Sequence, residues 1–181
     1  MKSLLIFVHV FLSLGLSAQK FYTKTGITGF KASVEAFESV EAISKSTTAI
    51  LNAENGEIAA LIFVKSFHFD VALMEEHFNE NYLDTKDFPK ATFKGQLNDF
   101  DVNKLTNAWT EFKITGTLKI RGIDKVINNL INIKMSNDKI IVNGFLVVSP
   151  SDFKIKIPGA VRSKISNEIK VTMNYELVEK K

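Results

Sequence analysis

The chain has 181 residues, the length of one domain or at most two. Its 23 basic and 20 acidic residues give a formal charge of +3 without a concentrated basic block, which argues against a dedicated nucleic-acid binder. Hydrophobic residues make up 45% and charged residues 24%, which excludes disorder along the whole chain and a polytopic membrane protein. The absence of cysteine excludes disulfides, thiolate metal sites, cysteine nucleophiles and a lipid-modified cysteine.

The first eighteen residues have the three-part pattern of a secretory signal peptide. Lys2 gives a positive start, residues 4–16 form an apolar run, and Ser17 and Ala18 are small. The run of about thirteen residues is shorter than the roughly 20 that a membrane-spanning helix needs. We predict cleavage after Ala18, a mature domain over residues 19–181, and a periplasmic or secreted protein. The alternative is an uncleaved anchor or a buried N-terminal strand.

The rest of the chain is dominated by strand signals. Side chains on successive residues of a strand take opposite faces, so alternation of apolar and polar residues predicts a strand with one wet face. The alternating segments are residues 91–98, 112–122, 127–135, 153–157 and 169–177. Two further runs, Ile58–Val64 and Ile140–Val148, are apolar on both faces, so alternation does not show which of their faces points inward.

Turn and helix signals separate these segments. Asn55-Gly56 is the strongest hairpin turn, and turns are also predicted at 122–124, 137–138 and 149–152. A short helix is expected over Val71–Phe78 with Asp70 as its cap, and a weaker one from about residue 158 or 160 to 166. Residues 34–43 fit one or two helical turns or an irregular strand.

The pattern predicts an all-β fold of about seven to nine strands in one domain. Antiparallel strands with one apolar face close into a barrel or pair into a sandwich. Long strands of about ten residues favour the barrel, and eight strands enclose room for packed side chains or for one small ligand.

Motifs for catalysis and metal binding are sparse. The chain has no glycine-rich phosphate loop, no Gly-x-Ser-x-Gly elbow and no His-Glu-x-x-His, and we predict neither a metal nor a cofactor. Acidic residues crowd around His77, and two carboxylates at a suitable spacing suffice for glycoside cleavage. A hydrolase using this region is therefore an alternative, although a solvated acidic rim is favoured. The acids are Glu75, Glu76, Glu80, Asp84 and Asp87.

Several segments, in order, resemble the YceI-like family of bacterial envelope proteins. Residues 66–69 and 73–82 are similar to a family strand and a short helix ending near a histidine. Phe88-Pro89-Lys90-Ala91-Thr92-Phe93 is similar to its turn into the next strand. Residues 116–122 match Gly-x-Leu-x-Ile-x-Gly, and Asp152-Phe153-Lys154-Ile155 matches a late Asp-Phe-x-Ile element. The resemblance covers roughly residues 55–178 and departs from the family pattern over residues 21–51.

The resemblance implies an extended, antiparallel eight-stranded barrel of lipocalin-like build with one or two short helices. Such a barrel holds a long lipid in an apolar interior, so the expected partner is an isoprenoid, an isoprenoid quinone or a fatty-acid-like lipid. It also implies a non-enzymatic carrier that contacts a membrane transiently, with no nucleic acid as partner. A filled core without cargo, as in an envelope stress or interaction module, is the other alternative, and the oligomeric state is open.

The candidate ligand-binding residues are the apolar side chains that alternation places on the inner face of the barrel. Lys65 shares the predicted inner face of Phe63 and Phe67. Either Lys65 lies at the mouth of the barrel, or the inner face of this strand is assigned one residue out of register. Gly95, Gly116 and Gly122 are expected to leave space beside the chain. The predicted lining residues are Leu61, Phe63, Phe67, Phe69, Phe93, Leu97, Phe112, Ile114, Leu118, Ile120, Ile133, Phe145, Phe153, Met173 and Tyr175.

Overall fold

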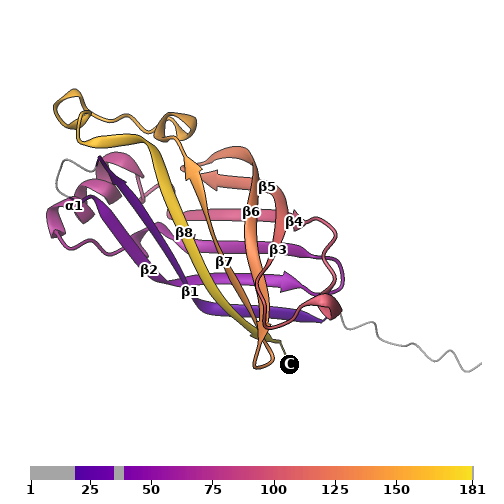
Figure 1. Ribbon diagram of the computed structural model, residues 1–181. Helices are drawn as coiled ribbons and strands as arrows, with labels where there is room; N and C mark the ends of the chain where they lie inside the picture. The colour runs from indigo at the N-terminus through magenta and orange to yellow at the C-terminus, as the bar shows by residue number, and fades with distance from the viewer. Residues whose placement is uncertain (1–18, 35–38, 181) are drawn as a thin grey trace, which may run out of the picture.

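A computed structural model describes residues 19–34 and 39–180 as one closed, antiparallel barrel of eight strands. The strands follow one another around the barrel in sequence order, and β8 pairs with β1 to close it (Figure 1). The all-β, eight-stranded prediction is therefore confirmed. The predicted signal peptide lies outside the described residues, so cleavage after Ala18 stays a prediction.

The strands are long, and the helical segments are short. The strands are β1 (Lys20–Ser33), β2 (Glu41–Asn52), β3 (Glu57–Phe63), β4 (Lys90–Leu97), β5 (Thr110–Ile120), β6 (Ile123–Ser136), β7 (Lys139–Val148) and β8 (Ile165–Glu179). The one α-helix of the described residues is α1 (Ala72–His77), which runs on into a π-helical turn, η2 (Phe78–Tyr82). Four 3₁₀ turns complete the described chain: η1 (Val64–Ser66), η3 (Val102–Lys104), η4 (Pro150–Phe153) and η5 (Gly159–Val161).

Two tight hairpins fix the register of the middle strands. Arg121 and Gly122 both have positive φ between the paired residues Ile120 and Ile123. Asn137 and Asp138 also have positive φ, between β6 and β7. Two-residue turns of this kind match the twist of an antiparallel ribbon, which explains their use here.

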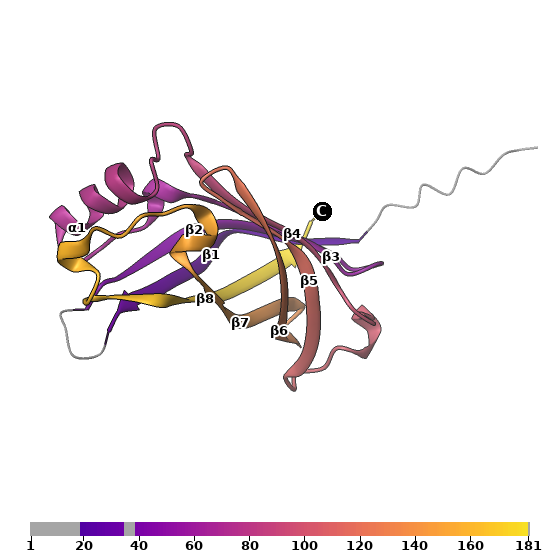
Figure 2. The same cartoon turned by 90° about the horizontal axis from the view of Figure 1, so that it is seen from above.

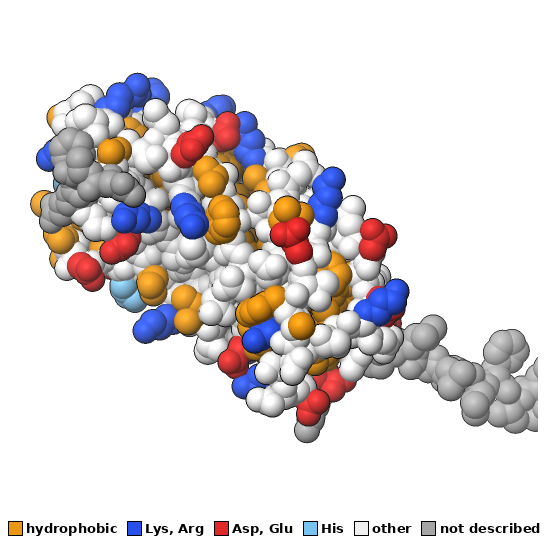
Figure 3. Space-filling view, in the orientation of Figure 1, with side chains coloured by type: hydrophobic (Ala, Val, Ile, Leu, Met, Phe, Trp, Pro, Cys, Tyr) orange, Lys and Arg blue, Asp and Glu red, His pale blue; other side chains and the backbone are white. Residues whose placement is uncertain are grey.

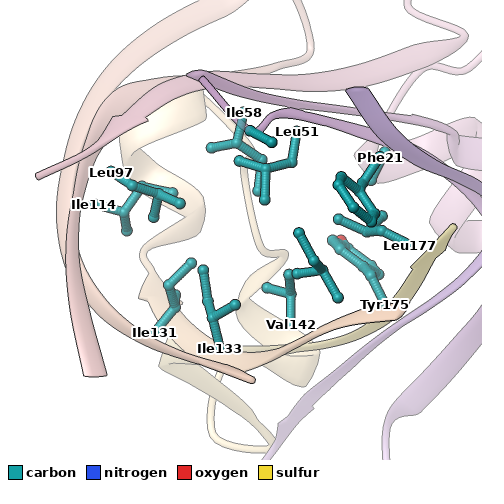
Figure 4. Close-up of a cluster of buried hydrophobic side chains, with 13 residues drawn as sticks. Phe21, Leu51, Ile58, Leu97, Ile114, Ile131, Ile133, Val142, Tyr175 and Leu177 are labelled. Atoms are coloured by element: carbon teal, nitrogen blue, oxygen red, sulfur yellow. The ribbon is translucent and has the colours of Figure 1, made fainter. Parts of the chain in front are cut away.

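The two ends of the barrel differ. Figures 1 and 2 both show α1 and the connection between β7 and β8 at one end, while the β2–β3 and β6–β7 turns lie at the other. The end with the β2–β3 and β6–β7 turns is packed solid. Figure 4 shows Leu51, Leu97, Ile133, Val142 and Leu177 pointing inward from the walls toward one another. Leu97 is 1% exposed, and this packed half anchors the fold.

Three sequence expectations about local structure were wrong. Residues 153–157 are not a strand, because the chain leaves β7 into η4, and Lys154 takes a left-handed conformation at φ +53°. Asp70 does not cap α1: the capping position is Val71, and the Glu75 carboxylate instead accepts a hydrogen bond from the Phe69 amide. The second helix is only the 3₁₀ turn η5.

No helix among the described residues is long and apolar enough to cross a membrane.

Candidate functional site: an apolar cavity

The other half of the barrel is hollow. A cavity of about 600 Å³ extends from the packed core toward the end that carries α1, and all eight strands contribute to its wall. This volume lies within the 300–1,000 Å³ of ordinary ligand sites and far exceeds the voids of a packed interior. Ile58, Ile114, Ile131, Val142 and Tyr175 belong both to the packed cluster and to the wall, so they form the floor.

Strand alternation explains why the wall is apolar. In β8 the buried or half-buried residues Ile169, Val171 and Met173 alternate with the exposed residues Lys170 and Thr172. The same alternation in the other strands turns Val, Ile, Leu, Phe and Met side chains inward. Lys164 is the single Lys, Arg, Asp or Glu side chain on the wall among the described residues. The cavity therefore favours a ligand that is apolar over most of its length.

Four phenylalanines support the wall beneath α1. Phe30 of β1 stacks on Phe78 with ring centroids 5.3 Å apart, and it meets the edges of Phe67 and Phe69 at 5.2 and 5.7 Å. Such aromatic contacts add about 0.5–1.5 kcal/mol per pair beyond the area that they bury. The cluster joins the helix to β1, so this part of the cavity wall is held in place.

The wall between β6 and β7 is completed by the η4 turn. The ladder between these strands ends at the pair Ile131 and Gly144, so β6 before residue 131 and β7 after residue 144 are not paired with each other. Phe153 of η4 is buried and lines the cavity. An ion pair of 3.0 Å between Lys125 and Asp152 ties η4 to β6.

A pair of glycines shapes one side of the cavity, although differently from our prediction. Gly95 and Gly116 are cross-strand partners, and a Cβ atom on either would lie 2.6 Å from the Phe93 ring. The space that these glycines leave is thus filled by Phe93. The ring can approach the sheet this closely because neither glycine has a side chain.

The structure brings ten of the fifteen predicted lining residues together on the cavity wall. Whether a lipid contacts them stays a prediction. The ten are Leu61, Phe67, Phe69, Phe93, Ile114, Leu118, Ile120, Phe153, Met173 and Tyr175.

The other five do not line the cavity. Leu97, Phe112 and Ile133 point inward, but they pack in the solid half of the barrel. Phe63 and Phe145 were assigned to the wrong face, since they lie outside and are 52% and 50% exposed. Both belong to runs that are apolar on both faces, where alternation does not identify the inner side.

The corrected register identifies lining residues that the sequence reasoning missed. In β7, Val142, Leu146 and Val148 face the cavity instead of Phe145. In β3, the inward side chains include Ala60 and Ile62. The outer position of the two phenylalanines is supported by cation–π contacts, since Lys90 and Lys170 lie over the rings of Phe63 and Phe145 at 5.2 and 4.4 Å.

The acidic region and His77 face different spaces. Glu75, Glu76, Glu80 and Asp84 border a surface depression, whereas His77 lines the apolar cavity. Within residues 19–34 and 39–180, no group of three His, Cys, Asp or Glu side chains is placed so that it could hold a metal ion. His77 therefore does not share a cleft with these carboxylates, and it is His68 whose Nδ1 lies 3.5 Å from the Glu75 carboxylate.

A family model described as the YceI-like domain matches residues 14–177, nearly the whole chain. The chain belongs to the YceI-like family. No curated protein sequence matches it significantly.

Solved structures show the same fold at low sequence identity. A polyisoprenoid-binding domain from Saccharophagus degradans is 15% identical with a TM-score of 0.74, and the alignment covers 90% of this chain and 99% of that one. BcnA from Burkholderia cenocepacia is 17% identical with a TM-score of 0.69, covering 84% and 96%. A YceI protein from Campylobacter jejuni is 20% identical with a TM-score of 0.59, covering 80% and 87%. These likenesses establish the YceI barrel for this chain.

Proposed function

We propose that this YceI-like protein is an exported, non-enzymatic carrier that holds an isoprenoid or another long-chain lipid in its hollow half. The observation that carries the proposal is the cavity of about 600 Å³ with an almost entirely apolar wall. The resemblance to a structure described as a polyisoprenoid-binding domain supports the choice of lipid.

The driving force is the removal of hydrocarbon from water. Each CH₂ group that enters the cavity contributes about 0.8 kcal/mol, and most of the wall consists of apolar side chains that need no specific polar partner. Met74 and Met173 border the cavity, and flexible thioether side chains fill irregular gaps around a tail. Binding is therefore set by tail length and shape more than by hydrogen bonds along the tail.

Loading from a membrane would use the rim near α1. Val71 and Leu73 line the cavity and are exposed, Leu73 by 57%. Figure 3 shows hydrophobic side chains at this end of the molecule beside Lys and Arg side chains. We expect Leu73→Asp to slow lipid extraction from anionic phospholipid vesicles much more than it lowers the affinity for dispersed lipid, because the exposed carboxylate stays hydrated. Unchanged extraction would contradict a rim that contacts the membrane.

Native mass spectrometry of the full chain, expressed in a bacterium with its leader, tests the carrier function. We expect a non-covalent adduct of constant mass that dissociates on activation as an intact lipid. A clean ligand-free mass under gentle conditions would contradict the proposal.

Neighbouring alanines of β3 provide a matched control. Ala60 lines the cavity near its floor and Ala59 does not, so Ala60→Phe removes ligand space whereas Ala59→Phe adds the same side chain outside. The adduct should diminish only in Ala60→Phe. Equal adducts in both variants would place the lipid elsewhere.

A further inference from the structure

The floor of the cavity carries a cluster of three hydroxyl groups, which we call the hydroxyl trio: Thr28 of β1, Thr47 of β2 and Tyr175 of β8. The Thr28 hydroxyl is hydrogen-bonded to that of Thr47 at 2.7 Å and to the Tyr175 phenol at 2.9 Å. All three residues are buried, and all three line the cavity. The trio therefore faces the innermost part of a space whose wall is mostly apolar.

The neighbouring backbone is arranged around the Tyr175 ring. The β1–β2 register shifts on both sides of Gly26, which pairs with Thr47. A Cβ atom at position 26 would lie 2.6 Å from the ring of Tyr175, so only glycine leaves room for it. The bulge in β1 and Gly26 together hold the Tyr175 side chain at the floor of the mostly apolar cavity.

The three hydroxyl groups are hydrogen-bonded to one another with unequal strength. Thr28 makes the two close contacts, and Thr47 is a second, weaker hydrogen-bond partner of the Tyr175 phenol. Each hydroxyl group donates one hydrogen bond, accepts up to two and rotates to suit its partners. The most weakly held O–H can therefore turn toward a guest in the cavity that offers a better acceptor.

The surroundings define the chemistry of that guest. No Lys or Arg of the described residues lines the floor, and Lys164, the wall's one cationic side chain, belongs to the segment between η5 and β8. A carboxylate or phosphate at the floor would therefore lack a counter-charge and would be costly to bury. A carbonyl or hydroxyl oxygen needs only one donor. Burial also raises the pKa of the Tyr175 phenol, which keeps its proton available for donation.

We propose that the hydroxyl trio receives the neutral oxygen of a lipid that enters with its polar end first, leaving its tail directed toward the mouth. The ligand class is then an isoprenoid ketone, quinone or alcohol in preference to a pure hydrocarbon or an ionised acid. This inference rests on the proposed lipid-binding function and adds a specificity and an orientation to it.

Three saturated C20 isoprenoid probes with the same carbon skeleton distinguish the possibilities: phytanol (dihydrophytol) as the alcohol, phytane as the hydrocarbon and phytanic acid as the carboxylate. Affinities are measured by displacement of an apolar fluorophore from the full protein. We expect the wild type to bind the alcohol about tenfold more tightly than either of the others, the scale of one added hydrogen bond. Equal affinity for the alcohol and phytane, or a preference for the carboxylate, would overturn the inference. If no probe binds, the proposed function fails as well.

The decisive variant is Thr28→Val, Thr47→Val and Tyr175→Phe combined, which removes all three hydroxyls with little change of shape. Replacing a whole hydrogen-bonded group by apolar isosteres is close to neutral for folding. Tyr175→Phe alone is the fallback should the triple variant not fold. We expect about a tenfold loss of phytanol affinity with phytane affinity unchanged. A purely structural role of the trio would lower both affinities together or neither, and either outcome would overturn the inference.

Discussion

Adjacent residues of β7 test which space holds the lipid, because they lie on opposite faces. Leu146 lines the cavity, and Phe145 is half exposed outside with Lys170 over its ring. Leu146→Asp puts a carboxylate where the lipid tail would bury it without a counter-charge. An uncompensated buried charge costs about 3–5 kcal/mol. At 1.4 kcal/mol per tenfold, the loss of affinity should be about 100-fold or more.

Phe145→Asp introduces the same charge one residue away on the outer face. It gives up a cation–π contact worth about 0.5–1 kcal/mol in stability, and it leaves the cavity unchanged. Lipid affinity should therefore stay within about twofold of the wild type. Titration with geranylgeranylacetone by fluorophore displacement measures both variants, and circular dichroism checks that each is folded. Equal losses in the two variants, or a loss confined to Phe145→Asp, would refute the reasoning.

Three further predictions concern stability, measured as the free energy of unfolding in urea. Gly122→Ala should cost about 1–3 kcal/mol of unfolding free energy, because the backbone φ of +74° disfavours a side chain. Gly159→Ala should change the unfolding free energy little, because a Cβ atom there meets nothing within 4 Å. Equal losses in the two variants would contradict the turn geometry. Leu97→Ala in the packed half should lower the unfolding free energy by about 2–5 kcal/mol, because it leaves a cavity in the core. Leu73→Ala on the exposed rim should lower the unfolding free energy by less than about 0.5 kcal/mol. The reverse order would contradict the division of the barrel into a packed and a hollow half. Burial raises the pKa of Tyr175 above 10.0, so stability should be full below pH 10 and fall as the pH rises through the folded pKa; a Tyr175→Phe variant with the same alkaline loss would contradict this.

The strands were predictable because alternation is strict where one face is exposed to water, and strand length and the family resemblance favoured a barrel over a sandwich. In β5 and β8, Lys, Thr, Asn and Glu occupy every second position, which identifies both the strand and its inner face. The inward placements of Leu118, Met173 and Tyr175 follow from this pattern. The two-residue turn at Asn137-Asp138 was also predictable from the sequence, since Asn and Asp tolerate positive φ.

The inner face of β3 and β7 was not predictable for a physical reason. Both strands carry apolar residues on both faces, and lysine side chains from neighbouring strands cover the outer rings of Phe63 and Phe145. That cover depends on cross-strand neighbours, which a single strand's sequence does not contain. The same holds for the boundary between the packed and hollow halves. Leu97 and Leu118 both point inward, and only the positions of the strand ends decide which of them meets a cavity.

Methyl NMR of leucine-labelled protein with and without geranylgeranylacetone tests most directly the claim that the hollow half holds the lipid. Leu118 and Leu146 line the cavity, Leu97 lies in the packed half, and Leu130 is exposed on the outside of β6. We predict that the methyl signals of Leu118 and Leu146 shift and show nuclear Overhauser contacts to the isoprenoid tail, while those of Leu97 and Leu130 do not. Contacts from the tail to Leu130, with the signals of Leu118 and Leu146 unchanged, would contradict the account.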